Sequence, residues 1–81
     1  MELCCILEGE GEVSLERIRQ FVTDEKQIRL LSANYNGWYQ RVGKGVYTLS
    51  QKGKEVLEEP AFQEAAAFYR KKYEERRREL L

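Results

Sequence analysis

The stretch at residues 35–53, YNGWYQRVGKGVYTLSQKG, predicts a β-hairpin with a helix on either side. Residues 38–42 and 46–49 are rich in aromatic and β-branched side chains, which favour strands. Gly43-Lys44-Gly45 lies between them, and its two glycines can adopt the backbone angles of a short hairpin turn. Because two strands alone are only marginally stable in water, neighbouring helices must cover this hairpin.

Two helices and a short strand are predicted at the start of the chain. Apolar residues at helical spacing between positions 3 and 7 predict a first helix, which Gly9 and Gly11 should end. Ser14 is a candidate N-cap for a second helix ending near Val22, and Val13 is expected to form a minimal strand before it.

A third helix is predicted after a very tight turn at Thr23-Asp24, since either residue can cap it. The residues expected to face inward are Ile28, Leu31 and Tyr35. Those expected to face outward are Glu25, Arg29, Ser32 and Asn36. Two helices joined by so short a turn fit a helix-turn-helix.

The chain after the hairpin is rich in helix formers. Ser50 should cap a fourth helix that ends at Glu59, and Pro60 separates it from a long helix over residues 61–81. We expect one domain at residues 1–59 and a C-terminal helix at residues 60–81, whose first half packs on the domain. The charged end of that helix, EERRRELL, should be solvated and frayed.

This order of elements is similar to the winged helix-turn-helix family over about residues 2–58. The resemblance rests on that order, on Gly45-Val46-Tyr47-Thr48-Leu49-Ser50 in the second hairpin strand and on Lys52-Gly53 in the next helix. It implies an α+β fold: a three-helix core, a two-to-three-stranded antiparallel wing formed by the hairpin, and here a long C-terminal helix.

Residues 35–53 also resemble the C-terminal part of a bacterial family of proteins assigned as PD-(D/E)xK phosphodiesterases, of unknown function. The nuclease core of that family is absent from this chain. The resemblance therefore implies an accessory domain, with catalysis located elsewhere.

The winged-helix resemblance implies binding of double-stranded DNA, with the third helix in the major groove and the wing at the backbone. The residues that it brings near base edges are Lys26, Arg29, Ser32, Ala33 and Asn36, and those near phosphates are Arg41 and Lys44. Arg can bind guanine and Asn can bind adenine through two hydrogen bonds. We expect a nucleic-acid-binding module, either a small transcription regulator or an accessory domain. Ordinary solvated polar residues are the alternative reading of the same pattern.

Charge supports DNA binding only in part, since residues 1–60 hold eight Lys/Arg and ten Asp/Glu. Asp24-Glu25 at the start of the third helix would repel phosphates, whereas no acidic residue lies between Trp38 and Lys54. The competing hypothesis is a protein-interaction or dimerisation module without DNA binding. Its contacts with a second copy or another protein would come from the long helix, through Phe68, Tyr69, Tyr73 and Leu80.

No catalytic or metal-binding pattern is visible, because the chain has no His and only two cysteines. We therefore expect no enzyme activity, no cofactor and no metal site. Cys4 and Cys5 should be free thiols, one facing the core and one facing outward. No apolar run approaches the roughly 20 residues of a membrane span, and we expect a cytoplasmic location.

Overall fold

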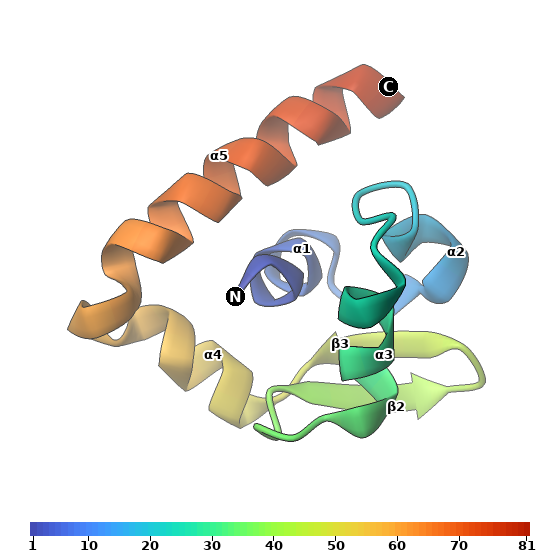
Figure 1. Cartoon of the computed structure of the whole chain (residues 1–81), viewed down its shortest axis with the longest axis horizontal. Coiled ribbons are helices and arrows are strands. Elements are labelled where there is room, and N and C mark those ends of the chain that lie inside the picture. The colour runs from blue at the N-terminus through green and yellow to red at the C-terminus, as the bar shows by residue number, and fades with distance from the viewer.

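The computed structural model describes all 81 residues and shows an α+β arrangement of five α-helices and three strands (Figure 1). In chain order the elements are α1 (Glu2–Glu10), β1 (Val13–Ser14), α2 (Leu15–Ile18), α3 (Glu25–Ala33), β2 (Tyr39–Gly43), β3 (Val46–Leu49), α4 (Gln51–Glu58), the 3-10 helix η1 (Pro60–Phe62) and α5 (Gln63–Leu80). The α+β class, the antiparallel wing and the long C-terminal helix predicted from sequence are confirmed. Membership of the winged-helix family itself stays a prediction.

The three strands form one antiparallel sheet in the order β1-β3-β2. We call β2, β3 and the turn between them the wing. Tyr39 of β2 lies opposite Leu49 of β3, and the register shifts by a bulge between Arg41 and Gly43. Gly45 has a φ of 68°, a conformation in which glycine carries no steric penalty, so it closes the turn.

Helix α1 is the centre of the fold and lies between α5 and the sheet (Figure 1). Contacts with α4, α5 and β3 bury five consecutive residues, Leu3, Cys4, Cys5, Ile6 and Leu7. The prediction that one cysteine faces outward is therefore wrong: a helix covered on several sides has no solvent-facing position along this stretch. The Cys5 thiol donates to the Ala66 carbonyl of α5 at 3.7 Å.

Helix α2 is shorter than predicted, because it ends at Ile18 rather than near Val22. Its N-cap is as expected, with the Ser14 hydroxyl accepting the Arg17 N–H at 3.2 Å. Beyond Ile18 the backbone tightens into a turn, in which the Phe21 N–H donates to the Ile18 carbonyl at 2.9 Å. This turn packs the Phe21 ring against the Tyr73 ring of α5, with centroids 5.0 Å apart. A loop over residues 19–24 thus replaces the two-residue turn predicted before α3.

Helix α4 begins in close contact with the segment that leads into the wing. The Ser50 hydroxyl accepts the Gly53 N–H at 3.1 Å and donates to the Gly37 carbonyl at 2.6 Å. Gly53 is buried so tightly that a Cβ on it would lie 2.3 Å from the Trp38 carbonyl oxygen. The position of the wing is therefore fixed by α4 as well as by the sheet. No helix of the chain combines the length and the apolar character that crossing a membrane requires.

Candidate nucleic-acid interface

Helix α3 shows a buried and an exposed face, as its sequence pattern predicts. Ile28 and Leu31 are buried in the core. The predicted site residues on the helix are all exposed, namely Lys26, Arg29, Ser32 and Ala33. Leu30, 41% exposed, lies on this outer surface too. The outer side of α3 is therefore free to contact a ligand.

The two carboxylates at the start of α3 have partners within the chain. The Asp24 carboxylate caps the helix by accepting the Lys26 N–H at 2.9 Å. The Glu25 carboxylate forms an ion pair with Arg19 from the preceding loop. These contacts offset part of the phosphate repulsion that the sequence suggests for this end of the helix.

The segment over residues 26–54 contains six Lys/Arg and no Asp/Glu. It includes α3 after its first residue Glu25, the wing and the first turn of α4, so the acid-free part of the chain is longer than the wing alone. None of the six ion pairs in the structure includes any of these six cations, which are Lys26, Arg29, Arg41, Lys44, Lys52 and Lys54. The acidic residues gather instead in residues 1–25 and after residue 54, which explains why an average over residues 1–60 hides the basic segment.

The wing presents its two predicted phosphate contacts to solvent. Arg41 is exposed, and only its Nε is engaged, donating to the Gly43 carbonyl at 3.2 Å. Lys44 is exposed in the turn, which is fixed to the start of α2 because the Leu15 N–H donates to the Gly45 carbonyl at 2.8 Å. A shallow surface depression beside this contact is lined by Lys44 and Arg19, together with Glu16.

The loop after α3 differs from the prediction. Helix α3 ends at Ala33, so Asn36 lies in the following loop rather than on the helix, although it is exposed. Tyr35, predicted to face inward, is 86% exposed. The cause is Asn34, which caps the helix in a left-handed conformation with φ 49° and so ends the helical periodicity before Tyr35.

Asn34 positions the loop beside the predicted interface, and the sequence pattern missed it. Its side chain forms two hydrogen bonds with the Tyr39 backbone, donating to the carbonyl at 2.8 Å and accepting the N–H at 3.1 Å. These bonds join the end of α3 to the start of β2 and so fix the loop between them. Nothing in the sequence pattern identified Asn34 as the residue that holds this loop.

Lys52 and Lys54 lie beside different parts of the chain. A Cβ on Gly37 would lie 3.6 Å from the Lys52 Cδ, so the Lys52 side chain lies beside the loop after α3. Lys54 instead lines a depression with Glu8, Glu58 and Arg70, where both signs of charge are present. Only Lys52 therefore extends the basic surface of α3 and the wing.

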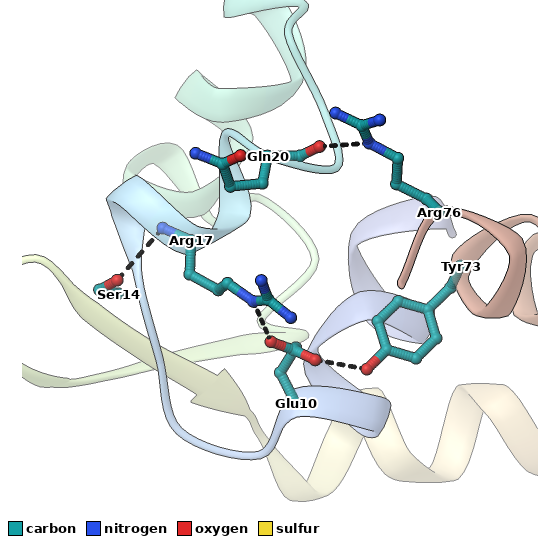
Figure 2. Close-up of polar contacts among 6 residues, drawn as sticks. All are labelled: Glu10, Ser14, Arg17, Gln20, Tyr73 and Arg76. Carbon is teal, nitrogen blue, oxygen red and sulfur yellow. Dashed lines mark hydrogen bonds and ion pairs between the residues drawn. The ribbon is translucent and has the colours of Figure 1, made fainter. Parts of the chain in front are cut away.

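A polar network behind the interface fixes α2, and with it the loop that leads to α3 (Figure 2). The Glu10 carboxylate accepts hydrogen bonds from Arg17 Nε at 2.7 Å and from the Tyr73 hydroxyl. Arg76 Nε donates to the Gln20 carbonyl at 2.8 Å. Helix α5 thus holds the turn after α2 through Arg76. Through Tyr73 it also holds the Glu10 carboxylate, which in turn binds Arg17 of α2.

Burial and hydrogen bonding act in opposite directions on the pKa of Glu10 and in the same direction on that of Tyr73. Burial alone would raise the Glu10 pKa, but the bonds from Arg17 and Tyr73 outweigh it, so the pKa is lowered. Burial, followed by the hydrogen bond to Glu10, raises the pKa of Tyr73 to about 12. The ionised carboxylate and the neutral phenol are therefore the stable pair at neutral pH.

The predicted association surface on α5 is only partly available. Tyr73 is 6% exposed, because its ring packs on Phe21 and its hydroxyl binds Glu10, so the prediction of Tyr73 as a partner contact is wrong. Tyr69 and Leu80 are half-buried. Phe68 is 64% exposed and remains as the main apolar side chain of that surface.

The carboxylates and thiols of the chain do not gather into a recognisable catalytic cluster. No group of three or more His, Cys, Asp or Glu lies close enough to hold a metal ion. Burial raises the pKa of the Cys4 thiol to about 11, and it also raises the pKa of the Cys5 thiol. The chain has one Asp/Glu-x-Lys triplet, Asp24-Glu25-Lys26, whose two carboxylates are engaged in the helix cap and the ion pair with Arg19.

Comparison with known proteins identifies the family of this chain. A family model described as "Putative PD-(D/E)XK phosphodiesterase (DUF2161)" matches residues 1–56. No curated protein and no solved structure matches the chain. The expectation of no enzyme activity is contradicted by this match, because the description of the family names an enzyme. That expectation rested on the absence of a catalytic motif in this chain. The absence of a motif here does not exclude an activity that is assigned to the family as a whole.

Proposed function

We propose that this chain, which belongs to the DUF2161 family, binds double-stranded DNA through α3 and the wing. The description of that family names phosphodiesterases. The observation that carries the proposal is the acid-free segment at residues 26–54, whose cations have no carboxylate partners. Phosphate contacts supply most of the affinity of DNA-binding proteins, and unpaired cations on an exposed surface are free to make them. The family assignment supports the same ligand, because DNA is a phosphodiester.

Within this proposal the two parts of the interface have different roles. Helix α3 is short and its outer side is exposed, which suits insertion into the major groove, where Arg29 can bind a guanine edge. Arg41 and Lys44 of the wing contact phosphates, which position the protein without reading sequence. The network of Glu10, Arg17 and Tyr73 supports α2 from behind. We place the protein in the cytoplasm, which two free cysteines support.

A salt titration with a fluorescein-labelled 16-base-pair duplex tests the proposal. The double variant Arg41→Gln, Lys44→Gln should bind more weakly and flatten the dependence of log affinity on log salt by about two phosphate contacts. The matched control is Lys71→Gln, Arg78→Gln, which removes the same charge from exposed, unpaired cations of α5. It should leave the slope unchanged. Equal effects of the two pairs, or no binding of the wild type at low salt, would refute the proposal.

Association through α5 is the second candidate function, favoured by the exposure of Phe68. Its ring is 64% exposed and contacts the Tyr69 ring edge-on, with centroids 5.1 Å apart. A second copy of the chain packing on this ring would bury it. Sedimentation of wild type and Phe68→Ala over a range of concentrations tests this, since a dimer that depends on Phe68 should dissociate in the variant. A monomeric wild type would eliminate this candidate.

A further inference from the structure

Tyr35 is the most exposed aromatic side chain of the protein. It is 86% exposed and follows α3 by two residues, within the acid-free segment. Burial of an aromatic ring stabilises a fold, so a ring left this exposed contributes little to folding. Its placement calls for another explanation.

The loop that carries Tyr35 is fixed on both sides. Before it, Asn34 holds the backbone of Tyr39 by two hydrogen bonds and accepts the Gly37 N–H on its own carbonyl at 3.0 Å. After it, the Ser50 hydroxyl binds the Gly37 carbonyl at 2.6 Å. The ring is thus displayed from a braced backbone, which lowers the entropy lost when a ligand binds it.

The surroundings of Tyr35 carry positive charge and hydrogen-bonding groups. The Lys52 side chain lies beside Gly37 of the same loop, and Asn36 is exposed next to Tyr35. Arg29 and Ser32 are exposed on the last turns of α3. An accessible aromatic ring in a segment that holds cations and no acids is the combination with which proteins stack unpaired bases and hold the adjoining backbone.

We propose that Tyr35 stacks on an unpaired base, and that the preferred ligand is duplex DNA containing unpaired nucleotides. This inference rests on the proposed function, since α3 and the wing would hold the duplex while Tyr35 lies just past the end of α3. Bases inside a duplex offer only their edges to a protein, because their faces are covered by their neighbours. A base that has lost its partner can expose a face to Tyr35, and the Asn36 amide next to it can bind the edge of that base.

The test compares two labelled 16-base-pair duplexes of the same sequence, one fully paired and one with a bulge of two thymines at its centre. Both probes have the same ends, so any difference comes from the bulge. Wild type should bind the bulged duplex about tenfold more tightly, as expected from one stacked base. Tyr35→Ala should lose that preference and keep its affinity for the paired duplex within about twofold, whereas Tyr35→Phe should retain the preference.

The matched control is Phe68→Ala, which removes the other strongly exposed aromatic ring, on α5. It should keep the tenfold preference. A wild type that binds both duplexes equally, or a Tyr35→Ala variant that keeps the preference, would refute the inference and leave the proposed function intact. Equal weakening of both duplexes by Tyr35→Ala would also refute it, because Tyr35 would then contact the backbone. Wild type that binds neither probe at low salt would refute both proposals.

Discussion

Replacing Gly53 by alanine should destabilise the protein, although the same change in most helices is stabilising. Gly53 lies in α4, where alanine would add about 1 kcal/mol of helix stability. Here the new Cβ would lie 2.3 Å from the Trp38 carbonyl oxygen and 2.6 Å from the Leu49 Cδ1. Ordinary contacts begin near 3.4 Å, so α4 and the segment before the wing must separate by about an ångström.

The magnitude follows from the contacts that such a separation would disturb. Overpacking of this kind costs about 1–3 kcal/mol. The Trp38 carbonyl also accepts the Ser50 N–H at 2.9 Å, and losing that bond costs about 1 kcal/mol more. After the gain in helix propensity, the net loss should be about 1–3 kcal/mol. In a domain of this size that lowers the melting temperature by at least about 5 °C.

Thermal melts followed by circular dichroism measure this loss. The matched control is Gly43→Ala, whose new Cβ would have no neighbour nearer than 3.8 Å and should change the melting temperature little. If Gly53→Ala melts at or above the wild-type temperature, the close packing of α4 on this segment is incorrect.

Four further predictions concern titration, reactivity and burial. Because the folded-state pKa of Glu10 is lowered, its contribution to stability is complete above its ordinary value of 4.5 and lost as the pH falls below it. As the pH is lowered, the melting temperature should therefore fall less steeply for Glu10→Gln than for wild type. Parallel curves for the two proteins would contradict this. The Tyr73 pKa is raised, so its contribution should be lost between about pH 10 and pH 12, and Tyr73→Phe should remove that alkaline transition in the same assay. Cys4 has no exposed surface and a pKa of about 11, so it should react with a thiol reagent only on unfolding, and rapid labelling of the native protein would contradict its position. Trp38 is half-buried against the core, so Trp38→Ala should lower the free energy of unfolding by about 3 kcal/mol, as measured by urea unfolding.

The parts of the fold that the sequence predicted are those set by local chemistry. Ser14 and Ser50 cap their helices as expected, and of the two candidates Thr23 and Asp24 it is Asp24 that caps α3. Each of these side chains accepts an N–H within its own first turn. The wing strands follow from β-branched and aromatic residues on either side of a glycine turn. These signals depend on neighbours in sequence, so they survive without knowledge of the tertiary structure.

The parts that sequence could not supply depend on contacts between distant elements. Helix α2 stops early because Phe21 packs on Tyr73, which is 52 positions away. Cys4 and Cys5 are both buried because α1 is covered on more than one side, which an amphipathic pattern cannot indicate. Tyr35 leaves the helical register because Asn34 adopts a left-handed conformation to reach Tyr39. The exposed site residues on α3 and the wing could be predicted from the sequence. The loop at Asn34 could not, because its shape depends on the contact of Asn34 with Tyr39.

The sheet order β1-β3-β2 leaves one edge of β2 without a partner strand. Such an edge exposes backbone groups that can pair with another chain and start aggregation. Along β2 the bulge between Arg41 and Gly43 interrupts the regular ladder, and the Arg41 charge disfavours the approach of an identical strand. Val42, 41% exposed, is the apolar residue that these two features guard. We therefore expect Arg41 to disfavour self-association through this edge, and neutralising it should lower solubility at high protein concentration.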